Sequence, residues 1–116
     1  MKIFISEYDR QNAYRAAILN IAKLHNVQHT DFKSNYELYE EVVILNSPLL
    51  TTLNSYLNVY DKWFDFYQKF KKIETERDID YKFNDIEKNE LAELITNRQN
   101  ALDELQKQYD ALRTKL

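Results

Sequence analysis

The fold of this chain is decided by residues 91–116, which read LAELITNRQNALDELQKQYDALRTKL. Apolar side chains recur there at the spacing of one helix face, and they are Leu91, Ile95, Leu102, Leu105, Leu112 and Leu116. Arg98 and Tyr109 occupy the same seam. Such a row marks the side of a long helix that packs against another helix. We therefore predict a helix over residues 85–116.

The composition favours a single helical domain that spans residues 1–116. The chain has 116 residues, 44% of them hydrophobic, which is enough to bury one core. It contains no glycine. Phosphate-binding loops, dinucleotide-binding turns and nucleophile elbows all need the backbone freedom of glycine, so these sites are excluded. Tight hairpins usually need glycine as well, so the sequence predicts an all-α protein, a small helical bundle.

Charge and the absence of cysteine narrow the function classes further. The chain has 16 basic and 19 acidic residues, and neither half is basic enough to indicate a phosphate-binding surface. Without cysteine it has no disulfides and no thiolate chemistry. No apolar run reaches membrane-spanning length, and Met1–Ser6 is too short for a signal peptide. We expect a cytoplasmic protein that makes no membrane contact.

Two short helices are predicted at the N-terminal end, over residues 6–26 and 34–46. Each begins with a serine that is followed three residues later by an acidic residue, which is the pattern of a capping box. In both segments apolar residues then recur at helical spacing. Two pieces fit a strand as well: residues 1–5 alternate weakly, and the β-branched run at residues 42–45 is too short for its period to decide.

A third helix is predicted to begin at Ser47-Pro48 and to run to residue 77. Serine caps helices, and proline at the first helical position loses no hydrogen bond that the helix needs. The apolar residues of this helix cover an arc of roughly 180–200°, which is wider than one packing stripe. The period breaks over residues 74–85. We therefore predict that the two long helices form an antiparallel hairpin, which the two shorter helices cover.

The wide apolar arc of the third helix is the first candidate site. Its aromatic members are Tyr56, Tyr60, Trp63, Phe66, Tyr67 and Phe70. Tyrosine and tryptophan are frequent at protein interfaces because they combine apolar area with a polar tip. If part of the arc is exposed, we expect a protein interface with Trp63 at its energetic centre. If the helix is central in the bundle, the same side chains form its core.

The row within residues 91–116 is the second candidate site, as a dimer interface or as the seam of the hairpin. Its positions are Leu91, Ile95, Arg98, Leu102, Leu105, Tyr109 and Leu112. The flanking positions are mostly apolar or neutral, whereas a coiled-coil dimer usually places complementary charges there. This favours packing within the chain, and a homodimer stays open. Arg98 on the seam is expected to need a carboxylate partner or a path to solvent.

His25 and His29 are the only histidines, at a spacing that aims two side chains of a helix in one direction. With Asp31 they would supply three ligands for zinc. Asn26 and Thr30 indicate that the helix ends between the histidines, so we expect no metal site. No order of residues suggests a catalytic triad, and glycine-supported oxyanion geometry is missing. We therefore expect no catalytic residue and no cofactor.

Residues 21–34 carry a pattern of small, turn and apolar residues, namely Ala22, Asn26, Val27 and Phe32. In this they resemble the helix-turn-helix of repressors. The resemblance implies a recognition helix that starts near Gln28 and contacts DNA through Gln28, His29, Thr30 and Lys33. Asn35 departs from the pattern where an aliphatic residue is expected. The corresponding function is a DNA-binding transcription regulator that dimerises through its C-terminal helix.

The function that we favour from the sequence is a non-enzymatic protein-interaction module. A small, acidic, glycine-free chain rich in Asn, Lys and Tyr has a composition common among phage and mobile-element accessory proteins. This association suggests that the chain inhibits a host or defence complex by steric occlusion in the host cytoplasm. The transcription regulator is the alternative.

Overall fold

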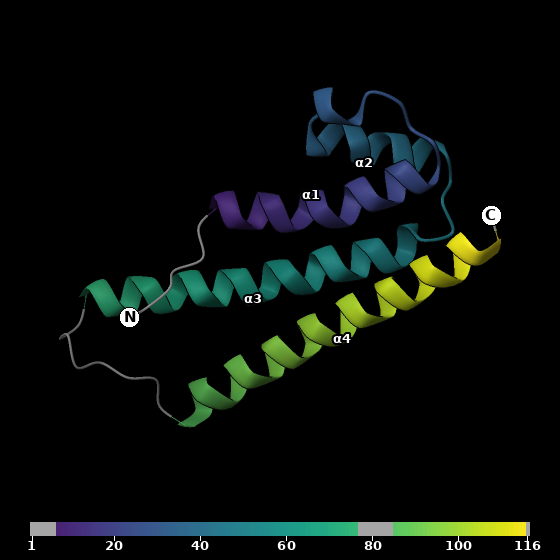
Figure 1. The fold of residues 1–116 in the computed structure, drawn as a ribbon. Helices are drawn as coiled ribbons and strands as arrows, with labels where there is room; N and C mark the ends of the chain where they lie inside the picture. The colour runs from purple at the N-terminus through teal and green to yellow at the C-terminus, as the bar shows by residue number, and fades with distance from the viewer. Residues whose placement is uncertain (1–6, 77–84, 116) are drawn as a thin grey trace.

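The computed structural model describes residues 7–76 and 85–115, with side chains for residues 7–68 and 85–115. Its elements are α1 (Glu7–Leu24), the 3-10 turn η1 (Thr30–Phe32), α2 (Asn35–Ile44), α3 (Leu50–Glu76) and α4 (Asp85–Lys115). The described residues contain no strand. The predicted all-α bundle, a long C-terminal hairpin with two shorter N-terminal helices, is confirmed (Figure 1). None of the described helices is both long and apolar enough to cross a membrane.

Helix α3 lies between α1 and α4, and both neighbours run antiparallel to it (Figure 1). Helix α2 packs against α1, on the side away from α4. The molecule is elongated and measures 53 × 27 × 22 Å. The position of α3 explains its wide apolar arc, because this helix must bury side chains against neighbours on two sides.

One hydrophobic cluster joins all four α-helices. Its buried members are Ile18, Ile21 and Ala22 of α1, Leu38 and Val42 of α2, Leu53, Tyr56, Tyr60, Trp63 and Phe64 of α3, and Leu105 of α4, with Leu49 just before α3. The ring centroid of Tyr60 lies 5.3 Å from that of Trp63 and 5.6 Å from that of Tyr14. Such edge-to-face pairs add to the energy of apolar burial. Helix α3 is therefore central in the bundle, which is the second of the two interpretations of its wide apolar arc.

Two serine caps open the later helices. The Ser34 hydroxyl accepts a hydrogen bond from the Glu37 backbone N–H (3.1 Å), and the Glu37 carboxylate accepts one from the Ser34 N–H (3.2 Å). The capping box predicted for α2 is thus present. The Ser47 hydroxyl accepts a hydrogen bond from the backbone N–H of Leu49 (3.2 Å), and α3 begins at Leu50, two residues later than predicted.

The turns that follow α1 and α2 contain left-handed residues, although the chain has no glycine. Asn26, His29 and Asn46 have φ values of 61°, 58° and 51°. Asparagine and histidine are among the few residues with a side chain that tolerate this region. The strand alternative for residues 42–45 is wrong, because α2 continues through residue 44 and ends at its C-cap. Residues 1–5 lie outside the described residues.

The side chain of Arg15 holds the link between α1 and α2. Its guanidinium donates hydrogen bonds to the backbone carbonyls of Thr30 (3.0 Å) and Lys33 (2.9 Å) and to the side-chain oxygen of Asn35 (3.2 Å). A guanidinium has five N–H donors in a fixed plane and can serve several acceptors at once. Arg15 therefore fixes η1 against α1 and sets the start of α2.

Helix α4 packs on α3 through a seam that is rotated from the predicted one. The α4 residues that contact the core or Trp63 are Leu91, Leu94, Arg98, Ala101, Leu105, Tyr109 and Leu112. Ile95 and Leu102, predicted on the seam, expose 39% and 38% of their surface and lie at its edge. Leu116 lies outside the described residues. The rotation brings Leu94 and the small side chain of Ala101 onto the core, while Arg98 stays on the seam.

Arg98 finds its partner in an aromatic ring. Its guanidinium carbon lies 4.1 Å from the centre of the Trp63 ring. The negative face of an indole attracts a cation, and this attraction is stronger where water is excluded. Arg98 is half-buried, so the expected path to solvent is present as well. The contact with the indole was not expected, because the sequence alone does not place Trp63 opposite Arg98.

Candidate protein-interaction surfaces

Four of the six aromatic side chains predicted as a protein interface are buried in the core of the chain. The exposed fractions are 5% for Tyr56, 6% for Tyr60, 3% for Trp63 and 9% for Phe66. Tyr67 is half-buried, with its ring centroid 5.2 Å from that of Trp63. Phe70 lies in α3, outside the described side chains. The members of the set with described side chains therefore do not form an open surface of α3, because neighbouring helices cover the central helix.

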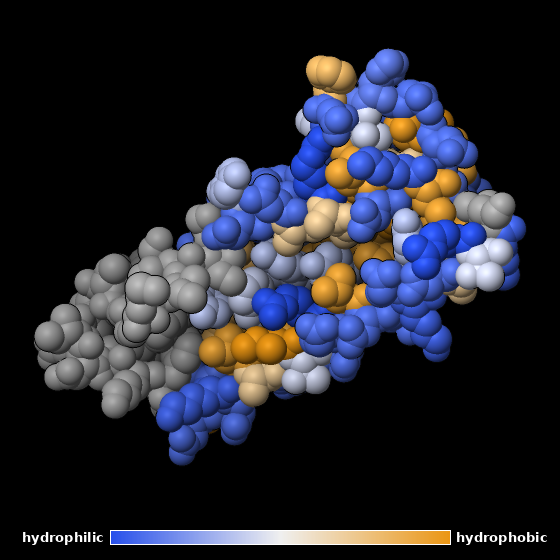
Figure 2. Space-filling model, in the orientation of Figure 1, coloured by the Kyte–Doolittle hydropathy of each residue, from blue (hydrophilic) through white to orange (hydrophobic). Residues whose placement is uncertain are grey.

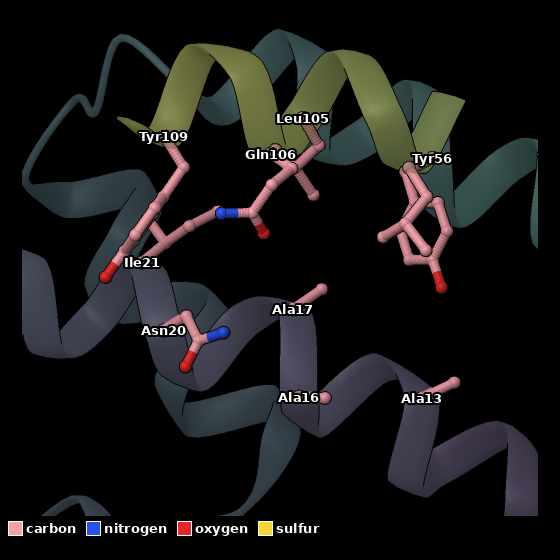
Figure 3. Close-up of a pocket in the computed structure, with 10 residues that line it drawn as sticks. Ala13, Ala16, Ala17, Asn20, Ile21, Tyr56, Leu105, Gln106 and Tyr109 are labelled. Carbon is pink, nitrogen blue, oxygen red and sulfur yellow. The ribbon is translucent and has the colours of Figure 1, made fainter. Parts of the chain in front are cut away.

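A groove lies between α1 and α4 over α3 and has a volume of about 190 Å³ (Figure 3). Its lining consists of Ala13, Ala16, Ala17, Asn20 and Ile21 of α1, Tyr56 of α3, and Leu102, Leu105, Gln106 and Tyr109 of α4. Tyr56 belongs to the predicted aromatic site, and the leucines and Tyr109 belong to the predicted seam. The groove therefore brings parts of both predicted sites together, and it adds a wall from α1 that the sequence did not indicate.

The small side chains of α1 leave this space open. Ala13, Ala16 and Ala17 present only methyl groups along the wall that faces α4 (Figure 3). Helix α4 packs mainly on α3, and α1 packs mainly on α2, so neither helix fills the space between them. In the sequence nothing distinguishes these alanines from other small residues of an apolar helix face. Only the pairing of the helices shows that they border a groove.

The polar groups of the groove stand toward its ends. The hydroxyls of Tyr109 and Tyr56 lie toward opposite ends, and the amides of Asn20 and Gln106 lie in the half nearer Tyr109 (Figure 3). Burial, and then the neighbouring Tyr60, raise the pKa of Tyr56 above its ordinary value of 10.0, so its phenol is neutral at physiological pH. None of the lining residues carries a charged side chain. The groove is suited to an uncharged, mainly apolar group.

A second candidate surface covers η1 and the outer side of α2. Its exposed apolar side chains are Phe32 (87%), Tyr36 (72%), Val43 (42%), Ile44 (76%) and Leu45 (46%). Figure 2 shows orange and tan side chains among the blue ones over this part of the molecule. Exposed apolar side chains that cluster on one surface mark interaction sites. The sequence signal that was missed is the run over residues 42–45, which has more apolar side chains than the inner face of α2 can bury.

The residues expected to contact DNA do not form a recognition helix. No helix begins at Gln28, because His29 is left-handed and only the short turn η1 follows it. Thr30 is buried, with 8% of its surface exposed. The Lys33 ammonium pairs with the Glu41 carboxylate at 2.8 Å. The expected helix-turn-helix is therefore wrong for this segment, since the turn is longer and differently built.

His25 and His29 serve the turns that follow α1. The Nε2 atom of His25 lies 2.8 Å from the Ser47 hydroxyl, and this hydrogen bond ties the end of α1 to the start of α3. His29 occupies the left-handed position before η1. Among the described side chains, those of residues 7–68 and 85–115, no three His, Asp or Glu are grouped as they would be around a metal ion.

No protein-family model, curated protein or solved structure matched this chain when it was compared with them. Its function is therefore inferred from its own surfaces. The α1–α4 groove is concave and uncharged, whereas the outer side of α2 is exposed and bordered by carboxylates. These two surfaces call for different occupants.

Proposed function

We propose that this chain is a non-enzymatic protein-interaction module that holds a helix of a partner protein in the α1–α4 groove. The groove itself is the observation that carries the proposal, because it is uncharged and has a volume of about 190 Å³. An apolar cavity of roughly 150 Å³ accommodates a benzene ring. The groove therefore has room for one aromatic or branched aliphatic side chain of the partner.

The arrangement of the helices explains why the occupant is a helix. The lining residues repeat at intervals of three and four along both α1 and α4. Helices pack with their axes about 8–10 Å apart by placing side chains between such rows. A helix over the groove would also cover Leu102, which is 38% exposed. Insertion of apolar anchor residues from a helix into a groove is a recurring mode of recognition.

Binding of this kind acts by occupying a surface. A helix that is held between α1 and α4 is unavailable to its other neighbours, so no chemical step is needed. The acidic, glycine-free composition supports a more specific proposal. In that proposal the partner belongs to a host or defence complex, which a phage or mobile-element protein inhibits by steric occlusion.

A charge placed in the groove tests the proposal. Ala16→Glu introduces a carboxylate into the groove, and Asn12→Glu introduces the same charge at an exposed position of α1 outside the lining. We expect Ala16→Glu to weaken partner binding by about tenfold or more, because docking would bury an unpaired charge. Asn12→Glu should bind like the wild type. Quantitative affinity purification, followed by titration of the retained partner, measures both effects.

Circular dichroism establishes that both variants keep their helices before binding is compared. If a partner retained by the wild type binds folded Ala16→Glu with equal affinity, the groove is not the binding site. Equal losses in the two variants would show that added negative charge is responsible, whatever its position.

A further inference from the structure

The outer side of α2 has a shallow depression that is separate from the groove. It has a volume of about 340 Å³ and is lined by Lys33, Tyr36, Glu37, Glu40, Glu41 and Ile44. Tyr36 and Ile44 expose 72% and 76% of their surface, whereas Leu38 and Val42 on the inner side of the helix expose none. Helix α2 is therefore apolar on two sides, and the described residues cover only the inner one.

The charged groups around the depression are mainly acidic. Glu41 is paired with Lys33, and Glu37 belongs to the capping box of α2. Glu40 is exposed and accepts a hydrogen bond from the Tyr36 hydroxyl. This hydrogen bond is the main cause that raises the pKa of Tyr36, and the negative charge of Glu40 is the second cause. A carboxylate has about four acceptor sites, so this bond leaves most of them free. The depression thus presents negative charge beside an exposed aromatic ring.

We propose that this depression binds an arginine side chain from a basic segment of a partner protein. A guanidinium can lie flat on the Tyr36 ring and donate two hydrogen bonds to Glu40, while its methylene stem covers Ile44. A lysine ammonium has neither the flat face nor the paired donors, so it fits less well. Nucleic acids and anionic membranes would bring phosphates to these carboxylates and be repelled.

The chain uses the same chemistry between α1 and α3. The guanidinium carbon of Arg10 lies 4.4 Å from the centre of the Phe64 ring. The same guanidinium pairs with the carboxylates of Glu7 at 2.5 Å and Asp61 at 3.4 Å. One arginine is thus held by an aromatic ring together with carboxylates. The depression on α2 offers the same two components, and both face solvent.

Three matched peptides test this proposal. Each consists of alanine and leucine with three arginines, three lysines or three glutamates at the same positions. We expect the arginine peptide to shift the NMR signals of Tyr36 and Ile44 until they saturate. The lysine peptide should bind about threefold or more weakly, and the glutamate peptide should not bind. Raising the salt concentration from about 0.05 M to about 0.5 M should weaken the arginine peptide, because surface charges are screened.

Variants of the depression separate its two components. Glu40→Gln keeps the shape but removes the charge, and Tyr36→Ala removes the ring. Each should weaken the arginine peptide by about fivefold or more, whereas Tyr36→Phe, which keeps the ring, should stay within about twofold of the wild type. Glu93→Gln removes a carboxylate from an exposed position of α4 and should bind normally. Ala16→Glu should also bind normally, which makes this result independent of the groove.

Three results would overturn the proposal. The first is equal affinity of the arginine peptide for the wild type and for Glu40→Gln with its helices intact. The second is equal affinity for the arginine and lysine peptides. The third is a set of saturating NMR shifts that are confined to residues outside α2 and η1.

Discussion

Trp63 is held between aromatic and cationic groups in the interior of the molecule. Its ring centroid lies 5.3 Å from that of Tyr60 and 5.2 Å from that of Tyr67. The guanidinium of Arg98 approaches it from α4 at 4.1 Å. Only 3% of Trp63 is exposed. This residue therefore links α3 to α4, and its contribution is to stability.

Truncation of Trp63 measures that contribution. We expect Trp63→Ala to lower the free energy of unfolding by about 3–5 kcal/mol, because it removes a large buried ring and leaves a cavity. Urea unfolding followed by circular dichroism gives this value. Trp63→Phe keeps a ring in place and should cost clearly less. If Trp63→Ala is as stable as the wild type but no longer binds the partner, Trp63 belongs to a protein interface, as the sequence first suggested.

The buried tyrosines make stability depend on alkaline pH. Burial is the main cause that raises the pKa values of Tyr56 and Tyr60 above 10.0. Below pH 10 both phenols are protonated in the folded and in the unfolded chain, so they do not change the free energy of unfolding with pH. Above pH 10 the unfolded chain releases these protons while the folded chain keeps them. The free energy of unfolding therefore falls as the pH rises from 10 through the raised pKa values. Urea midpoints measured across this range should fall.

The double variant Tyr56→Phe, Tyr60→Phe has no phenol to ionise at these positions. Its urea midpoint should therefore fall less steeply above pH 10 than that of the wild type. Tyr8→Phe is the matched control, because Tyr8 exposes 74% of its surface. Identical alkaline slopes for the double variant and the wild type would show that other groups govern the transition.

At the scale of elements, α1 and α2 are each followed by an asparagine that tolerates a left-handed backbone. Asn46 follows α2 with φ 51°, and its N–H donates a hydrogen bond to the Val43 carbonyl at 3.0 Å. We expect Asn46→Val to lower the free energy of unfolding by about 1–2 kcal/mol, because a β-branched side chain is strained there. Asn46→Gly should be at least as stable as the wild type. Chemical unfolding measures both, and equal losses for Val and Gly would show that the asparagine side chain itself is required.

Helix α4 shows how an element can be predicted while its orientation is not. Its extent was evident from its apolar period. The side that packs on α3 includes Leu94 and Ala101 and leaves Ile95 and Leu102 at the edge. A row of leucines on one helix does not specify which neighbouring row is turned inward. That choice depends on the side chains opposite, and here the aromatic α3 accepts Arg98.

At the scale of the whole molecule, the side of α4 that could have formed a dimer is used within the chain. Leu105 is buried against the other helices, and Ile95 and Leu102 remain only partly exposed. A stable dimer usually needs about 800 Å² of contact from each partner. We therefore expect a monomer of 14.1 kDa in size-exclusion chromatography coupled to light scattering. A dimer that dissociates on Leu102→Lys would mean that a second copy, and no other protein, covers the groove.

The helices of this protein could be predicted from its sequence more completely than its surfaces. The order of the helices, their approximate bounds and the capping box at Ser34 could be predicted, because they depend on neighbours in the sequence. The groove could be predicted only in part: Tyr56, Leu102, Leu105 and Tyr109 belonged to predicted sites, but the alanine wall did not. The outer side of α2 was missed, since the apolar run over residues 42–45 was weighed only as helix or strand and not as an exposed surface.

The sequence by itself determined an all-α bundle, because apolar spacing, capping residues and the lack of glycine act within a few residues of one another. Only the tertiary structure decided which apolar side chains are surface. It placed Trp63 inside by setting α3 between two helices, and it left Ile44 outside because α1 covers only one side of α2. Exposure depends on what lies opposite a side chain, and that neighbour is usually distant in the sequence.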